Sequence, residues 1–86
     1  MARTISVAAL QAAFGEDMDA NIATVKELVR EAAGRGAQVV LPPELFQGPY
    51  FCKVQDERFF ATAWPAMEHP CVTALAPLAA ELGVVI

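Results

Sequence analysis

The sequence predicts an α/β fold built on parallel strands, and three observations predict it. Residues 5–10 form an apolar run, residues 17–34 form an amphipathic segment, and residues 37–41 form a second apolar run. A strand, a helix and a strand joined by short connections make a unit with parallel strands and a right-handed crossover. The first run is apolar at consecutive positions in its second half, which indicates a strand that is covered on both faces.

The helix of this unit is expected to begin between Asp17 and Asp19, where an aspartate can accept free N–H groups and favour the positive helix end. Gly34 or Gly36 supplies the left-handed residue that ends it. The apolar residues between these limits recur at helical spacing and form one stripe: Ile22, Val25, Val29, Ala32 and Ala33.

The second strand has a stiff exit. Pro42 and Pro43 follow it directly, and neither carries an N–H group that could continue a central sheet ladder. Glu44 comes next, at the carboxyl end of the strand, where ligands of α/β proteins usually bind. We expect Glu44 to be a general base on a rigid mount, with Leu45 and Phe46 excluding water. The alternative is an ordinary exposed loop glutamate.

Residues 46–55 are expected to form a long loop whose aromatic residues suit either a pocket wall or packing against the sheet edge: Phe46, Tyr50 and Phe51. A short helix should then run from Asp56 to Trp64. Its predicted inward residues are Phe59, Phe60, Ala63 and Trp64.

A last helix should run from Pro70 to about Leu82 and end at Gly83, before a third strand begins. Pro77 lies inside this pattern and should kink the helix or delay its start, because proline removes a backbone hydrogen bond. The predicted inward residues are Val72, Leu75, Ala76, Ala79 and Leu82.

Composition excludes several classes of function. The formal net charge is −4 and the six Lys and Arg residues are scattered, so nucleic-acid binding is not expected. No stretch reaches the length of a membrane span and the N-terminal apolar run is too short for a signal peptide, so we expect a cytoplasmic protein with no membrane partner. A glycine-rich phosphate loop is also missing, since Gly34 and Gly36 stand at the wrong end of their helix.

The two cysteines allow three interpretations. Cys52 and Cys71 could pair, but reduced thiols are favoured in a cytosolic protein. With His69 they supply too few ligands for a metal site, so no metal is expected. Cys71 follows Pro70 at a helix start, where a lowered pKa would make it a nucleophile; a small, buried apolar residue is the stronger interpretation.

We expect residues 1–86 to be the N-terminal part of a single domain that continues past Ile86. The hydrophobic content of 56% exceeds what one thin core of this size can bury. The last residues, Gly83 to Ile86, have the character of a strand that has just begun.

Several segments together resemble the nitrilase superfamily of carbon–nitrogen hydrolases. They are a first strand ending in Gln11, Asn21 in the first helix, the run Glu31-Ala32-Ala33 with Gly36-Ala37, and Leu41-Pro42-Pro43-Glu44-Leu45-Phe46. Within that family, the run from Glu44 to Gln55, Phe59-Phe60 and the His69-Pro70 turn are similar to N-carbamoylputrescine amidases. The likeness covers the whole chain.

This resemblance implies an α-β-β-α sandwich with a catalytic glutamate, lysine and cysteine, no metal, no organic cofactor and a homo-oligomeric enzyme. Only the glutamate maps onto this sequence, at Glu44; Lys26, Lys53 and both cysteines do not match, so residues 1–86 alone should be inactive. The implied substrate is a small carbamoyl amine, N-carbamoylputrescine, which a thiolate attacks while Glu44 moves the protons and the lysine stabilises the oxyanion. Tyr50 is the predicted substrate-binding residue of the pocket wall.

Two alternatives remain. One is an amidohydrolase for another N-carbamoyl amine, an N-carbamoyl amino acid or an ω-amide. The other is a non-catalytic α/β module in which Glu44 caps a backbone group or forms a salt bridge.

Overall fold

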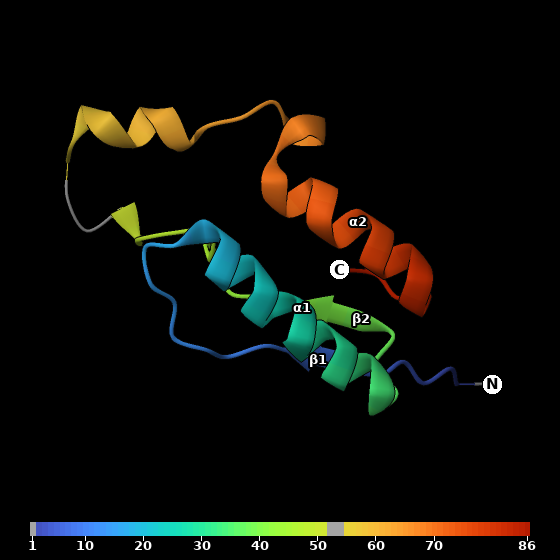
Figure 1. Cartoon of the computed structure of the whole chain (residues 1–86). Helices are drawn as coiled ribbons and strands as arrows, with labels where there is room; N and C mark the ends of the chain where they lie inside the picture. Colours follow the sequence, from blue (N-terminus) through green and yellow to red (C-terminus); the bar gives the residue numbers. More distant parts are fainter. Residues whose placement is uncertain (1, 52–54) are drawn as a thin grey trace.

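The computed structural model describes residues 2–51 and 55–86. Strand β1 spans Val7–Ala9, helix α1 spans Met18–Gly34, strand β2 spans Val39–Leu41 and helix α2 spans Pro70–Leu82 (Figure 1). Two short 3-10 helices, η2 (Glu57–Thr62) and η3 (Ala66–Glu68), lie between β2 and α2. The predicted element order is confirmed.

Helix α1 begins and ends as its sequence predicts. The Asp17 side chain accepts a hydrogen bond from the backbone N–H of Ala20 at 3.2 Å, which satisfies one of the free donors of the first turn. Gly36, just past the helix end, has a φ of +95°. Glycine adopts this left-handed conformation without steric cost, so the chain can turn back towards β2.

The two strands are parallel, and Val85 near the C-terminus joins them through a single β-bridge. β1 pairs with β2 in the register Val7 with Val39 and Ala9 with Leu41. Val85 forms a parallel bridge with Val39, and the Val40 N–H donates to the Val85 carbonyl at 2.8 Å. The predicted α/β class with parallel strands is therefore confirmed, and Val85 marks the predicted start of the third strand.

Both strands are shorter than predicted: the Gln38 N–H donates across to the Ser6 carbonyl at 2.8 Å, but other backbone groups at these N-terminal ends bond outside the strand pair. The Ala37 N–H donates to the Ala32 carbonyl at the end of α1, at 3.0 Å. The Ser6 N–H donates to the side-chain oxygen of Gln38, also at 3.0 Å. Residues 5 and 6 and residues 37 and 38 therefore lie outside the paired strands.

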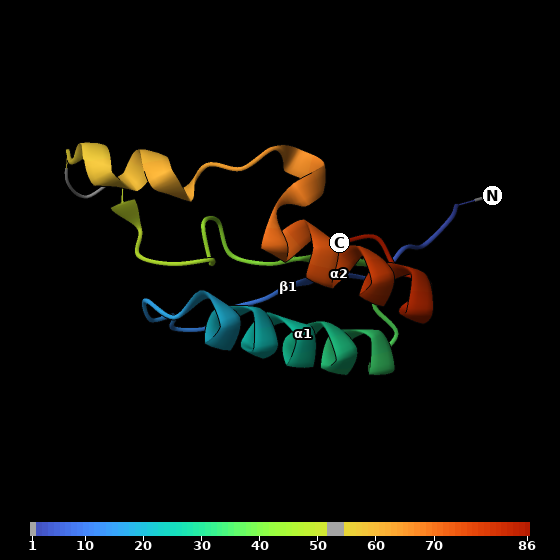
Figure 2. The same cartoon turned by 45° about the horizontal axis from the view of Figure 1, so that its top comes forward.

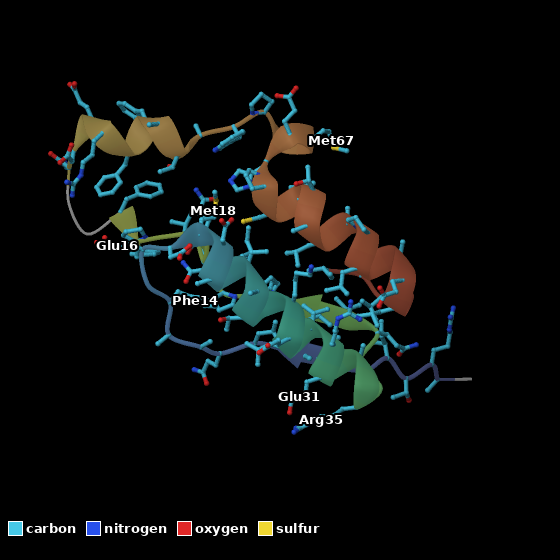
Figure 3. The ribbon with its side chains drawn as sticks, in the orientation of Figure 1. Phe14, Glu16, Met18, Glu31, Arg35 and Met67 are labelled. Carbon is cyan, nitrogen blue, oxygen red and sulfur yellow. The ribbon has the colours of Figure 1, made fainter. Side chains whose placement is uncertain are left out.

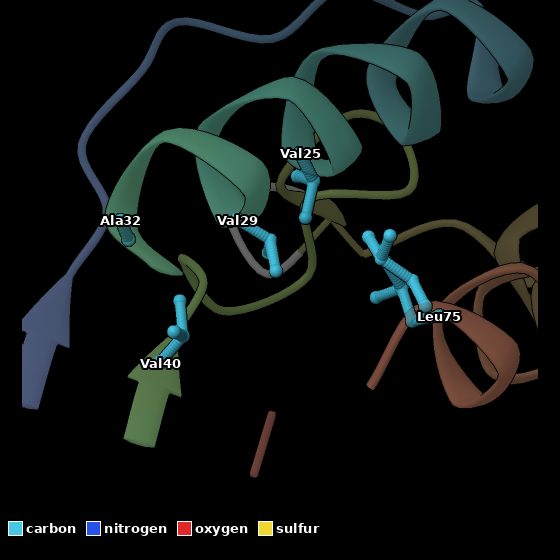
Figure 4. Close-up of a cluster of buried hydrophobic side chains, with 6 residues drawn as sticks. Val25, Val29, Ala32, Val40 and Leu75 are labelled. Atoms are coloured by element: carbon cyan, nitrogen blue, oxygen red, sulfur yellow. The ribbon is translucent and has the colours of Figure 1, made fainter. Parts of the chain in front are cut away.

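One face of the sheet carries the hydrophobic core. Val40 is 1% exposed and packs with residues of both helices: Val25, Val29, Ala32, Leu75 and Leu78 (Figure 4). The helices lie side by side, and an ion pair between Arg30 and Glu81 links them (Figure 2). Successive right-handed crossovers in one direction place their helices on the same face of a sheet, which explains this arrangement.

The opposite face of the sheet is exposed in the described part of the chain. Val7 is 69% exposed, Leu41 is 68% exposed and Val85 is 63% exposed. The prediction that the first strand is covered on both faces is wrong for this part of the chain, since both helices pack on the Val40 side.

Helix α2 has its predicted bounds, but it differs from its prediction in which residues face inward. It begins at Pro70 and continues through Pro77, so the proline does not delay its start. Leu75 and Leu78 are buried, whereas Val72 and Ala76, both predicted to face inward, are exposed. The reason is that α2 packs against α1 as well as the sheet, which turns the Leu75 and Leu78 side into the core.

The predicted helix between Asp56 and Trp64 is the short 3-10 helix η2, and its predicted inward face is wrong. Phe59 is half-buried, but Phe60 is 80% exposed, Trp64 is 49% exposed and Ala63 is exposed. This segment extends away from the two-helix layer, so it has little surface to pack against (Figure 1).

A buried asparagine ties the loop before α1 to the helix. Asn21 is 4% exposed; its amide nitrogen donates to the Gly15 carbonyl at 2.9 Å, and its amide oxygen accepts from the Gly15 N–H at 3.2 Å. Both polar ends of the side chain are thereby satisfied by one residue of the loop. Asn21 thus fixes the position of the residues on either side of Gly15.

Replacing Asn21 with alanine should lower the free energy of unfolding of the full-length protein by about 1–3 kcal/mol, because Gly15 loses the partner of both backbone groups. Urea-induced unfolding measures this loss. Thr24→Ala is the control, since the Thr24 hydroxyl bond to the Ala20 carbonyl on the same helix is exposed. Equal losses for the two variants would show that Asn21 does not fix the loop.

Candidate active site

Glu44 begins a tight turn at the carboxyl end of the sheet. The Leu10 N–H donates to the Leu41 carbonyl at 2.9 Å where β2 ends. Pro42 and Pro43 follow, and residues 44–47 form a turn. Leu45 has a φ of +54°, a left-handed conformation that costs a leucine about 1–2 kcal/mol. The chain thus changes direction immediately after Glu44.

The Glu44 side chain is exposed, but it lines an open cleft of about 480 Å³. One wall comes from the loop before α1, which carries Phe14 and Glu16 (Figure 3). The other walls come from the turn after β2 and from η2: Leu45, Phe46, Gly48, Pro49, Tyr50, Phe51, Arg58 and Phe59. The structure therefore brings together both residues that the sequence singled out, Glu44 and Tyr50, in one cleft.

Aromatic rings fill the walls of this cleft. Phe46 packs against the hydrophobic core, and its ring lies 5.9 Å from the ring of Phe14. The rings of Phe51 and Phe59 stack at 5.8 Å. Such aromatic pairs contribute more stabilising free energy than the burial of their surface alone would give. The three aromatic residues predicted for this loop, Phe46, Tyr50 and Phe51, all line the cleft, and Phe46 also packs on the core.

The cleft holds charges that the sequence did not single out. Glu16 places a second carboxylate on the wall. Arg58 also lines the cleft; its guanidinium lies 3.2 Å from the Asp56 carboxylate and 4.8 Å from the centre of the Phe59 ring. No spacing or motif in the sequence points to either residue, since Glu16 reaches the cleft from the loop before α1 and Arg58 from η2, and only the fold brings these two segments together.

Glu44 has no hydrogen-bond or ion-pair partner among residues 2–51 and 55–86. The structure thus gives no sign of the capping or salt-bridging role that the non-catalytic interpretation assigns to it. A carboxylate that lines an aromatic cleft and has no partner in the described part of the chain can accept a proton from a bound group.

His69 and Cys71 do not line this cleft, and they lie at the start of α2. The Nδ1 atom of His69 accepts the N–H of Cys71 at 3.0 Å and so caps the first turn of α2. Cys71 is a half-buried free thiol, and burial raises the pKa of that thiol. The lowered pKa considered for Cys71 is therefore wrong, because burial disfavours the charged thiolate and raises the pKa. Cys52 and Lys53 lie outside the described residues.

Cys71 should react slowly with iodoacetamide at pH 7.5, because its raised pKa leaves less thiolate than a free cysteine has. Peptide mass spectrometry of the alkylated full-length protein separates Cys71 from other thiols. A short cysteine peptide serves as the reference. Alkylation of Cys71 faster than the peptide at this pH would contradict the assignment.

Within the described residues, no group of three or more His, Cys, Asp and Glu side chains is placed to hold a metal ion. None of the described helices combines the length and apolar character needed to cross a membrane.

Comparison with known proteins identifies the family. Residues 6–86 match the family model for carbon–nitrogen hydrolases. The chain belongs to the carbon–nitrogen hydrolase family. The α/β fold and the resemblance seen in the sequence are both confirmed by this match.

Three curated relatives are similar to this chain over most of its length. The chain is 49% identical over 84 residues to an N-carbamoylputrescine amidase from Solanum tuberosum and 46% identical over 84 residues to one from Arabidopsis thaliana. Each match covers 98% of this chain and 28% of the relative. A citrullinase from Francisella tularensis is 34% identical over 82 residues, covering 95% of this chain and 29% of the relative. The chain therefore spans less than a third of the length of these relatives.

Proposed function

We propose that this chain is the N-terminal part of a hydrolase that converts N-carbamoylputrescine to putrescine, carbon dioxide and ammonia, with Glu44 as its general base. The observation that carries the proposal is the Glu44 carboxylate, which follows two prolines at the carboxyl end of the sheet, lines an aromatic cleft and has no partner among the described residues. The identities of 49% and 46% to N-carbamoylputrescine amidases support this choice of substrate.

In the proposed reaction, Glu44 takes the proton of a cysteine thiol that the family resemblance places beyond Ile86. The thiolate forms a bond to the carbamoyl carbon, and a lysine ammonium stabilises the oxyanion. The C–N bond to the putrescine chain then breaks, and Glu44 gives its proton to the departing amine. Glu44 next takes a proton from water as the water attacks the carbamoyl-enzyme. The thiol is released, and the resulting carbamic acid breaks down to carbon dioxide and ammonia.

The charges of the cleft favour an amine substrate over an amino acid. Glu16 and Glu44 are both carboxylates, and the guanidinium of Arg58 is already paired with Asp56. The terminal ammonium group of N-carbamoylputrescine gains from this negative potential, whereas citrulline carries an α-carboxylate beside its α-ammonium group, and repulsion of that carboxylate offsets the gain. We therefore expect N-carbamoylputrescine to be preferred over citrulline, the substrate suggested by the name of the Francisella relative. Tyr50 is proposed as part of the wall that contacts the substrate chain.

Ammonia release by the full-length protein tests the proposal with N-carbamoylputrescine, citrulline and a simple ω-amide. We expect kcat/KM for N-carbamoylputrescine to exceed the other values at least about tenfold. A higher kcat/KM for citrulline or for the amide would show that N-carbamoylputrescine is not the preferred substrate, while hydrolysis of a C–N bond would still stand. A failure to release ammonia from all three would favour the non-catalytic α/β module.

A further inference from the structure

We propose that Leu45 is a positioning residue whose left-handed backbone holds the Glu44 carboxylate in the cleft. This inference rests on the proposed function, because it assumes that Glu44 is the general base. Leu45 is the one non-glycine residue with a positive φ, +54°, among residues 2–51 and 55–86. At Gly36 and Gly83, where left-handed turns end helices, the chain uses glycine instead.

The backbone is the part of the structure that orients Glu44. Its side chain has no hydrogen-bond partner in the described part of the chain, so no contact there fixes its direction. The ring of Pro43 restricts the backbone before Glu44. The turn at Leu45 sets the direction of the backbone after it. Glu44 is thereby confined from both sides.

The strained turn is kept in place by the packing on either side of it. Phe46 packs against the hydrophobic core, and its ring contacts the ring of Phe14. The Leu45 side chain is half-buried and lines the same cleft as Glu44. A strained residue persists only where its surroundings hold it, and such residues concentrate at functional sites. Alanine at position 45 removes the packing of the side chain but still disfavours a positive φ. The turn in Leu45→Ala should therefore relax to another backbone conformation.

Leu45→Ala and Leu45→Gly in the full-length protein separate the backbone conformation from the side chain. Both remove the wall contact, but only glycine adopts a positive φ freely. We expect Leu45→Gly to keep most of kcat for N-carbamoylputrescine. In Leu45→Ala kcat should fall roughly tenfold below that of Leu45→Gly, because relaxation of the turn displaces the base. KM should differ little between the two, and the acid limb of the kcat profile against pH should shift in Leu45→Ala alone.

Leu28 provides the matched control, since it is a half-buried leucine in the helical backbone of α1. There, Leu28→Gly should be less stable than Leu28→Ala, because glycine is the poorer helix former, and neither should change kcat. Equal kcat values for Leu45→Ala and Leu45→Gly would overturn the inference. A lower kcat for Leu45→Gly than for Leu45→Ala would also overturn it, since a freely adopted positive φ would then not help to position Glu44. Glu44→Gln, measured in parallel, distinguishes the two proposals. If Glu44→Gln stays active, the proposed function fails. If Glu44→Gln loses activity while Leu45→Ala and Leu45→Gly have equal kcat values, only the positioning role of Leu45 is refuted.

Discussion

Glu44→Gln should lower kcat for ammonia release from N-carbamoylputrescine by about 10²–10⁴-fold in the full-length protein, which is the range that a general base contributes. Glutamine keeps the size of the side chain but cannot take a proton from a thiol or from water. The Glu44 side chain is exposed and has no partner in the described residues. The fold should therefore survive the substitution, with an unchanged unfolding midpoint.

Glu27→Gln is the control for this experiment. Glu27 is exposed on the outer side of α1, and the same chemical change there should leave kcat unaltered. Equal activity of Glu44→Gln and the wild-type protein would exclude Glu44 as the base. A fall in both kcat and the unfolding midpoint would instead indicate a structural role for the carboxylate.

Leu78→Ala should lower the free energy of unfolding of the full-length protein by about 2–5 kcal/mol. Leu78 is 3% exposed and packs in the cluster formed by α1, α2 and Val40. Alanine leaves a cavity there, because two helices and the sheet meet at this point and cannot close together without losing other contacts. Urea-induced unfolding measures the loss.

Met67→Ala is the comparison for Leu78→Ala. Met67 is 81% exposed on η3 (Figure 3), so its truncation should change stability by no more than about 0.5 kcal/mol. A loss under 1 kcal/mol for Leu78→Ala, or a loss equal to that of Met67→Ala, would show that Leu78 is not part of the core on which the two helices pack.

The first half of the fold could be predicted because local signals agree there. Asp17 caps α1, the apolar stripe of that helix faces the core, and Gly36 turns the chain towards β2. Each of these signals depends only on residues that are close together in the chain, so it can be recognised without knowledge of the tertiary contacts. The position of Glu44 after two prolines at the carboxyl end of β2 was predictable for the same reason.

The second half could not be predicted in the same detail because its burial depends on contacts between distant segments. The periodicity of α2 allows either Val72 and Ala76 or Leu78 to face inward, and contact with α1 decides for Leu78. Phe60 and Trp64 look like core residues by composition, yet their segment extends beyond the layer that could bury them.

The candidate site shows the same division. Glu44 and Tyr50 could be singled out from the sequence, and both line the cleft. Glu16 and Arg58 could not, because they reach it from a loop before α1 and from η2. The left-handed conformation of Leu45 carries no sequence signal either, since leucine is not a residue that favours positive φ.

The distance between the Glu44 carboxylate and the nucleophilic sulfur, in a crystal structure of the full-length protein, tests the central claim most directly. If Glu44 is the base, one of its oxygens should lie within hydrogen-bond reach of a cysteine sulfur, at about 3–3.5 Å or somewhat longer without substrate. A carboxylate turned away from the cleft, with no thiol in reach directly or through one water molecule, would contradict the account.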